Sequence, residues 1–239
     1  MDWTLVYVIA AILILPAFIY GGISHIVATN TFDKYSKNLA QSGITASELA
    51  RKLLDNAGLK DVEVVRIDGR LTDCYDPRYK VVKLSSATYD SSSIAALGVC
   101  AHEIGHAIQD AKGTFLFRLR SSIVPAVSFL SKMYIPLILL GSILSFTFMI
   151  ESIGYYLIWA AVIMYGADTL FYFVTLPLEH DASRRALDML RETNTLNGSE
   201  LSSANNVLKA AIQTYIATLA ISLLYFLRFL SYAMIFKKD

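Results

Sequence analysis

Long apolar blocks alternate with polar stretches along this sequence, and four of the blocks are long enough to cross a membrane. The first runs from Trp3 to about Ile23. It has neither a basic start nor a small-residue cleavage pattern, so we interpret it as a retained span rather than a signal peptide. Met133–Ile150 and Tyr155–Leu176 follow as two antiparallel spans, and about Ala211–Ile235 is expected to form the fourth. About 20 helical residues cover the roughly 30 Å apolar core of a bilayer.

The polar stretch from about Asn30 to Gly113 has the pattern of a small soluble region. Thr31–Ser42 is expected to form a short helix of its own. Thr45-Ala-Ser-Glu48 is a capping box, so it predicts the start of a second helix. Asp61–Ile67 and Tyr79–Leu84 have the alternation of short strands, which predicts a small β element.

The remaining polar segments extend or connect helices. Ile94–Ala111 is expected to be helical, with N-cap residues just before it. Lys112–Lys132 mixes basic and apolar residues, which is typical either of an interfacial helix or of the protruding start of the next span. Pro177 is expected to open a separate polar helix, because proline is favoured at the first helical position. Glu200 to about Phe236 is expected to form one helix whose first part stands in water.

Composition supports an integral membrane protein. Of the 239 residues 55% are hydrophobic and 17% are charged, and the mean hydropathy is +0.48. The net charge of +1 gives no reason to expect nucleic acid as a partner. The only two cysteines, Cys74 and Cys100, do not form a disulfide framework, and we interpret both as ordinary buried thiols.

His102-Glu-Ile-Gly-His106 carries the candidate chemistry. On a helix, His102 and His106 lie one turn apart on a single face, so both imidazoles can reach one Zn²⁺. Glu103 lies beside them, where it can take a proton from a water molecule that the metal activates. The alternative is a chance match in a polar helix.

A catalytic zinc site needs a third protein ligand, which should lie downstream on the same side of the membrane. Glu179-His-Asp181 is the obvious cluster there. Glu179 would complete a site of two histidines and one glutamate, whereas His180 would complete a site of three histidines. Spacing favours Glu179 without excluding His180, and the cluster could also be a set of solvated acids near a helix start.

Three blocks of residues together carry a resemblance to a known family. They are Asp73-Cys-Tyr-Asp-Pro-Arg78, Ala101-His-Glu-Ile-Gly-His-Ala-Ile-Gln109 and Leu176-Pro-Leu-Glu-His-Asp-Ala-Ser-Arg-Arg-Ala186. In this order they resemble the YugP-type family of membrane zinc metallopeptidases over nearly the whole chain, and more distantly the HtpX-type proteases. The resemblance implies that Glu179 is the third metal ligand, in the gluzincin manner.

The chain departs from that resemblance at two positions. HtpX-type enzymes usually carry Asp four residues after the ligand glutamate, where this chain has Ser183. A carboxylate supporting the ligands must then come from elsewhere, and Asp181 is a weak substitute. The family commonly has His where this chain has Cys74, so a histidine has no role there.

We therefore expect a mainly α, integral membrane protein with four transmembrane helices and a cytoplasmic, zincin-like α+β catalytic region. The segments expected are the first transmembrane helix (1–28), the zincin-like region with the HExxH helix (29–117), an interfacial or helix-extension segment (118–132), the second and third transmembrane helices (133–176), the third-ligand helix and linker (177–210), and the fourth transmembrane helix with the C-terminus (211–239).

The predicted function is that of a zinc-dependent endopeptidase with one Zn²⁺ per chain. His102, His106 and Glu179 are the expected metal ligands, and Glu103 is the expected general base. The alternatives are a non-catalytic membrane protein with a structural zinc site, a transporter, or a zinc hydrolase of non-peptide bonds. Tyr79–Leu84 is either a strand that pairs with substrate or only a packing element. Candidate donors to the developing oxyanion are Tyr75, Tyr89, Arg184, Arg185 and Tyr215.

Charge predicts the orientation in the cell membrane. Four spans place the HExxH helix and the Glu179 helix on one side, which also holds most of the basic residues near the membrane, so the positive-inside bias places the site in the cytoplasm. Expected partners are a peptide or protein substrate, membrane proteins included, and the lipid bilayer. Asp168 and Arg228 lie within spans, where they either join helices or line a substrate groove.

Overall fold

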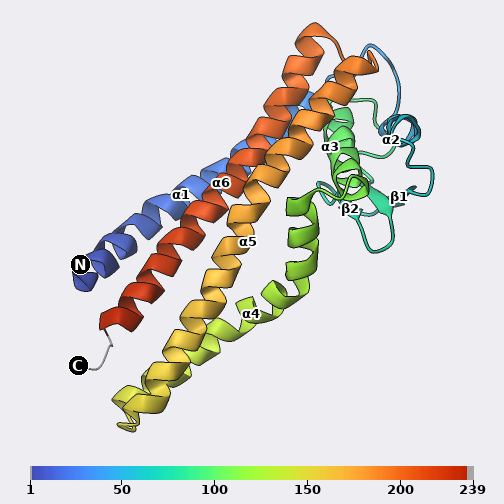
Figure 1. The fold of residues 1–239 in the computed structure, drawn as a ribbon. Helices are drawn as coiled ribbons and strands as arrows, with labels where there is room; N and C mark the ends of the chain where they lie inside the picture. Colours follow the sequence, from blue (N-terminus) through green and yellow to red (C-terminus); the bar gives the residue numbers. More distant parts are fainter. Residues whose placement is uncertain (1, 236–239) are drawn as a thin grey trace. The chain divides into compact units, whose positions relative to one another are not determined.

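Helices dominate the computed structural model, which describes residues 2–235 (Figure 1). Four of them are long and apolar enough to cross a membrane: α1 (Trp3–Ser36), α4 (Phe115–Phe146), α5 (Glu151–Glu192) and α6 (Gly198–Ile235). The shorter elements are the helices α2 (Ala46–Asn56) and α3 (Ile94–Ala111) and the strands β1 (Glu63–Ile67), β2 (Cys74–Asp76) and β3 (Val81–Ser85). The mainly helical architecture, the four candidate spans and the small β element are therefore confirmed.

The contacts divide the chain into two units, and the long helices contribute to both. Unit 1 comprises Met1–Ile23, Ser122–Leu176 and Tyr215–Asp239, whereas unit 2 comprises Ser24–Ser121 and Pro177–Thr214. Unit 2 contains α2, α3 and the whole sheet, so the HExxH motif and the Glu179 cluster belong to one unit.

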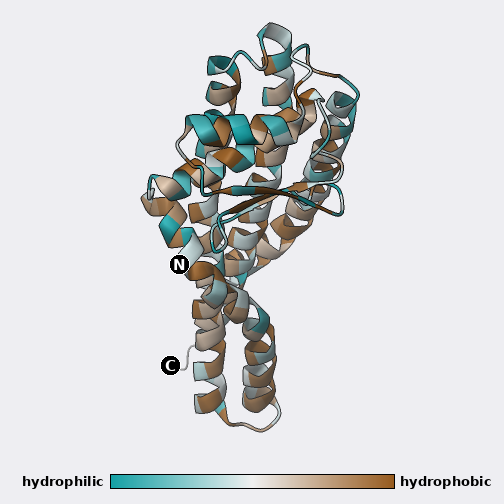
Figure 2. Cartoon of the chain, turned by 90° about the vertical axis from the view of Figure 1, so that its right-hand side faces the viewer, coloured by the Kyte–Doolittle hydropathy of each residue, from teal (hydrophilic) through white to brown (hydrophobic). Residues whose placement is uncertain are grey.

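Unit 1 consists of the apolar parts of the four long helices. In the most apolar window of each helix only 6% to 39% of the residues are buried, so most of the apolar surface there faces outward and needs an apolar solvent. Figure 2 shows the apolar residues in brown along these helices. Arg228 of α6 donates a hydrogen bond to the Tyr7 hydroxyl of α1 at 3.2 Å, so it joins two helices, which is one of the two roles considered for it.

Two helix boundaries expected from the sequence are wrong. Residues 31–36 are not the start of a short helix, because they form the last turns of α1. Pro177 does not open a new helix either, since α5 continues through it from Glu151 to Glu192. Proline removes only one backbone hydrogen bond, and membrane-crossing helices tolerate it when neighbouring groups compensate. Most of Lys112–Lys132 belongs to α4, which continues from Phe115 through the second expected span to Phe146.

The sheet of unit 2 has the strand order β1-β3-β2. β1 pairs in parallel with β3, from Glu63 opposite Val81 to Ile67 opposite Ser85, and β2 pairs antiparallel with β3. The three-residue strand β2 was not expected from the sequence. It forms one edge of the sheet, and β3 lies in the centre.

Local signals explain where the two short helices of unit 2 begin. Thr45 and Glu48 form the predicted capping box at the start of α2, and the Ser93 side chain accepts a hydrogen bond from Ala96 N at 3.2 Å at the start of α3. The apolar face of α2, with Leu49 and Leu53, packs into a core shared with α3, the sheet, α5 and α6. This core fixes the position of α3, whose two histidines carry the candidate chemistry.

Helices α3 and α5 approach each other closely at Gly105. A Cβ atom built there would lie 2.8 Å from the backbone oxygen of Ala182, closer than any side chain can stand. Gly98, about two turns earlier on α3, meets α6 instead. A Cβ atom at Gly98 would lie 3.5 Å from the Ala204 side chain, which is ordinary contact.

We expect Gly105→Ala to lower the thermal unfolding midpoint of the detergent-solubilised protein. The new methyl group must push backbone away from backbone, which costs roughly 1–3 kcal/mol and so at least about 2 °C for a chain of this size. Gly98→Ala is the matched control and should keep the wild-type midpoint or raise it. Equal midpoints for the two variants would show that the crossing is looser than described.

Candidate functional site

Three potential metal donors converge in unit 2. His102 and His106 come from successive turns of α3, and Glu179 comes from α5; their donor atoms all lie within 4.8 Å of one another. Glu179 Oε2 is 3.1 Å from His102 Nε2 and 3.4 Å from His106 Nε2. The neighbouring His180 is exposed and does not join the cluster. The geometry therefore brings together the glutamate, not the histidine, of the two alternatives that spacing left open.

In both histidines Nε2 faces Glu179, and Nδ1 contacts a side chain that holds the ring in place. His106 Nδ1 lies 2.9 Å from Gln109 Oε1, and His102 Nδ1 lies 3.1 Å from the Ser183 hydroxyl. Gln109 uses its amide group to donate to Leu178 O and to Asp181, so its oxygen must face His106. His106 therefore carries its proton on Nδ1, which leaves the lone pair of Nε2 free for a metal ion.

This chain has Ser183 where HtpX-type enzymes usually carry an aspartate. Here the two imidazoles are supported by Ser183 and, indirectly, by Asp181. Ser183 contacts His102 directly. Asp181 acts one step further out, because it accepts a hydrogen bond from the Gln109 amide at 2.9 Å, and Gln109 in turn holds His106. Gln109 is fully buried and fixes both α3 and α5 at this point.

Glu179 is a nearly completely buried carboxylate, with only 1% of its surface exposed. Oε2 faces the two imidazoles, whereas Oε1 has no hydrogen-bond partner among residues 2–235. Arg120 Nη1 of α4 lies 3.2 Å from Oε1, close enough for an ion pair but without the direction of a hydrogen bond. A carboxylate this deeply buried needs a cation nearby to remain ionised.

Glu103 is buried next to the three donors. Its Oε2 accepts a hydrogen bond from Tyr75 N of strand β2 at 2.8 Å, which fixes the direction of the carboxylate. Burial is the main cause that raises the pKa of Glu103 to about 7; the charge of Glu179 adds to this rise, and His102 opposes it. A carboxylate with this pKa can both accept and release a proton near neutral pH.

Strands β2 and β3 both contact α3, but the edge strand there is β2 and not the expected Tyr79–Leu84 segment. β3, which covers most of that segment, is paired on both sides by β1 and β2, so it has no free edge for another chain. The backbone N–H of Tyr75 in β2 points away from β3 and toward α3, where Glu103 takes it. Its hydroxyl donates to Asp110 at 2.7 Å, so Tyr75 lies along α3.

The other residues expected near the site have different surroundings. Arg184 and Arg185 both bind Asp181, at 2.7 Å and 2.6 Å. Tyr89 packs against the apolar core, Tyr215 belongs to unit 1, and the Cys100 thiol contacts Ala46 O at 3.1 Å. Sequence reasoning missed Gln109 and Arg120 as site residues. Only the basic character of Arg120 was visible, and it predicted nothing more than proximity to a membrane.

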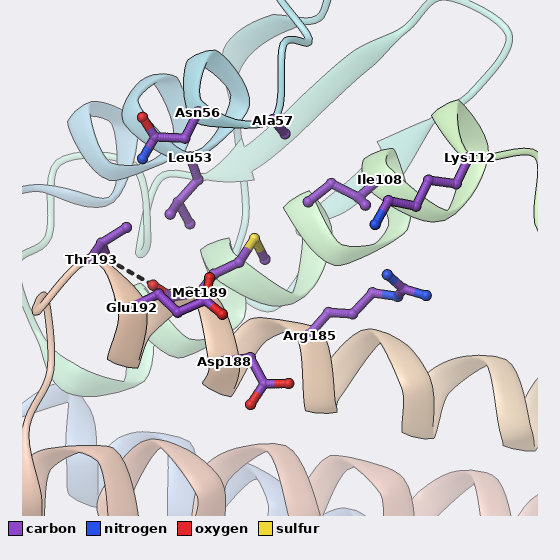
Figure 3. Close-up of a pocket in the computed structure, with 10 residues that line it drawn as sticks. All are labelled: Leu53, Asn56, Ala57, Ile108, Lys112, Arg185, Asp188, Met189, Glu192 and Thr193. Carbon is purple, nitrogen blue, oxygen red and sulfur yellow. Dashed lines mark hydrogen bonds between the residues drawn. The ribbon is translucent and has the colours of Figure 1, made fainter.

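A cavity of about 310 Å³ lies between α2, α3 and α5, apart from the three donors (Figure 3). Its apolar lining includes Leu53, Ile108 and Met189, and its charged lining includes Lys112 and Arg185. None of the three donors is among its lining residues. The cavity is therefore distinct from the donor cluster, although Arg185 connects the two through Asp181.

The donor cluster fits a zinc ion. Two neutral imidazoles and one carboxylate are a set that Zn²⁺ binds, and three protein ligands leave one position open. The unpaired oxygen of buried Glu179 and the fixed tautomer of His106 are both what a cation at this place requires. Metal ions that prefer only oxygen ligands fit less well, because two of the three donors are nitrogen.

Comparisons with known proteins agree with this chemistry. Residues 10–234 match a family described as "putative neutral zinc metallopeptidase". The chain is 40% identical over 200 residues to the protein described as "putative membrane protease YugP" of Bacillus subtilis, covering 84% of this chain and 85% of that protein. No solved structure matches the chain. The expected resemblance to the YugP-type family is confirmed, and this multi-pass membrane protein belongs to that family.

Proposed function

We propose that this chain is a membrane-integral zinc-dependent endopeptidase that hydrolyses peptide bonds in proteins, membrane proteins included. The observation that carries the proposal is the convergence of His102, His106 and Glu179 with a buried Glu103 beside them. The arrangement of a motif helix, an adjacent sheet edge and a ligand from a downstream helix supports a zincin-like catalytic region of the gluzincin type.

The proposed metal ligands are His102, His106 and Glu179, with one Zn²⁺ per chain. When bound, zinc would polarise a water molecule and the carbonyl group of the scissile peptide bond. Gln109 and Ser183 keep the two imidazoles oriented, and the burial of Glu179 excludes competing water from its carboxylate.

Glu103 is the proposed general base. Tyr75 N holds one carboxylate oxygen, which leaves the other to accept a proton from the attacking water. The carboxylic acid formed in this way can then pass the proton to the leaving amine. The chain's own residues thus complete one proton cycle for each bond cleaved.

The alternatives left open by the sequence are less well supported. A structural zinc site is usually closed by four protein ligands, whereas within residues 2–235 the cluster offers three. A structural role also gives no reason for a buried Glu103 with a raised pKa. A zinc hydrolase of non-peptide bonds would use the same donors, so only a substrate test separates it from a peptidase.

We expect Glu103→Gln to keep zinc but to lower the rate of casein cleavage in detergent micelles by about 10²- to 10⁴-fold, because the amide cannot accept the proton. Glu63→Gln is the matched control, since Glu63 is exposed on β1 and should leave the rate unchanged. Zinc content by mass spectrometry and cleavage by gel assay are measured on the same preparations. Wild-type cleavage rates in the Glu103→Gln variant would refute its role.

Glu179→Gln should weaken zinc binding by at least about tenfold, because the neutral amide is a poor ligand for the ion. His180→Gln is the control that tests the rejected ligand, and it should bind zinc like the wild type because His180 is exposed. Competition with a fluorescent zinc chelator gives both affinities. If His180→Gln weakened zinc binding more than Glu179→Gln, the third ligand would be His180.

We also propose that the donor cluster lies on the cytoplasmic side of the cell membrane, as the distribution of basic residues indicates. The two native cysteines allow a direct test. Cys100 is the buried thiol expected from the sequence, whereas the same expectation is wrong for Cys74, which is exposed. A membrane-impermeant maleimide should leave Cys74 unlabelled on intact cells and label it in inverted vesicles. As a control, Ser152→Cys in a Cys74→Ser background should be labelled on intact cells. Labelling of Cys74 on intact cells would show that the donor cluster lies on the outer side of the membrane.

A further inference from the structure

Peptide hydrolysis needs a donor for the negative charge that develops on the carbonyl oxygen, and this inference rests on the proposed function. Three of the side chains expected to supply that donor contact other residues and not the three donors. Tyr75 donates to Asp110, and Arg184 and Arg185 bind Asp181. The proposed peptidase therefore needs another hydrogen-bond donor, among the described residues around the cluster, that can reach the carbonyl oxygen.

The start of α4 covers one side of the donor cluster. Gly113, with φ of 61°, reverses the chain between α3 and α4, and the first turns of α4 therefore lie against the C-terminal half of α3. Phe117, which is 4% exposed, packs its ring 6.2 Å from the ring of His106 and 6.3 Å from that of Tyr75, measured between centroids. Arg120 follows three residues later and so lies on the same face of α4.

Arg120 is anchored at the cluster and still has free donors. Its Nη1 lies 3.2 Å from Glu179 Oε1, and 28% of its side chain is exposed. Its contact with Glu179 is an ion pair and not a hydrogen bond. A guanidinium group has five N–H donors, so most of them remain available to an anion that arrives beside Glu179.

Pairing with Glu179 alone does not account for this geometry. An arginine whose only role is to neutralise a carboxylate commonly binds it through two parallel hydrogen bonds, whereas Arg120 approaches one oxygen without such a bond. The contact with Glu179 holds the guanidinium at the cluster, and 28% of the Arg120 side chain is exposed.

We propose that Arg120 is a catalytic residue that binds the negative charge developing on the scissile carbonyl oxygen. The water attacks the carbonyl carbon, the electron pair of the C=O bond moves to the oxygen, and Arg120 N–H groups donate to that oxygen. When the C–N bond breaks, the electron pair returns to the carbonyl and the amine leaves with the proton that Glu103 carried. Arg120 only donates hydrogen bonds in this cycle and transfers no proton.

The test compares Arg120→Gln and Arg120→Lys with Arg118→Gln. Arg118 is a matched control because it lies on the same helix, and its guanidinium contacts the Gly113 turn instead of Glu179. The substrate is a peptide with blocked termini, so recognition of a terminal carboxylate cannot imitate the effect. Zinc content, kcat and KM are measured for each, together with the affinities of two inhibitors. A phosphoramidate dipeptide presents a tetrahedral anion, whereas a mercaptoacyl dipeptide binds a metal through sulfur and presents none.

Arg120→Gln should retain zinc, lower kcat by roughly 10²- to 10³-fold and leave KM nearly unchanged. Phosphoramidate affinity should fall with kcat while mercaptoacyl affinity stays constant. For Arg120→Lys, kcat and phosphoramidate affinity should lie between those of the wild type and Arg120→Gln, because lysine keeps the charge but loses the planar donor set. Arg118→Gln should behave as wild type.

Two results would overturn the assignment. Unchanged kcat and phosphoramidate affinity in Arg120→Gln would show that Arg120 touches no reacting atom. Loss of zinc with an equal fall in both inhibitor affinities would show that it only supports Glu179. If Arg120→Gln does not fold, Arg120→Lys decides by the same criteria. If the zinc-loaded wild type cleaves no peptide, the proposed function fails, and the inhibitor comparison still decides whether Arg120 binds an anion.

Discussion

The close approach of α3 and α5 at Gly105 and Ala182 is the contact on which the site depends. His102 and His106 flank Gly105 within one turn of α3, and Glu179 lies one turn before Ala182 on α5. Because only a glycine allows two helix backbones to come this near, its position inside the motif decides whether the third donor can reach the other two. The three donors can therefore come together only because Gly105 has no side chain.

Burying so many polar groups at one crossing is costly unless each has a partner. Gln109 meets this requirement for three groups at once, because it binds His106, Leu178 O and Asp181. The carboxylate of Glu103 is held by a backbone N–H of β2. The oxygen of Glu179 beside Arg120 is left without a hydrogen bond, and this exception marks where the site must receive something from outside.

Elements whose formation depends on neighbouring residues could be predicted from the sequence, whereas elements that depend on contacts with distant residues could not. The bounds of α3 could be predicted because the Ser93 cap and the helical pattern are local. Strand β2 was missed because three residues carry no alternation, and only pairing with β3 makes them a strand. The unbroken course of α5 through Pro177 depends on surroundings that the sequence pattern does not show.

The same distinction holds for the site. The two histidines and Glu103 followed from their spacing, and Glu179 followed from a family resemblance together with the requirement for a third ligand. Gln109 and Arg120 could not be identified, because their partners come from another helix far along the chain. Neither residue type signals a metal site by itself, so only the folded arrangement reveals what they do.

X-ray absorption at the zinc edge of the purified, detergent-solubilised protein tests the central claim most directly. The account predicts one zinc per chain with a shell of nitrogen and oxygen ligands at about 2.0–2.1 Å, the imidazole scattering of two histidines and no sulfur. A sulfur shell at about 2.3 Å, four protein ligands that leave no open position, or a purified chain that binds no zinc would contradict it.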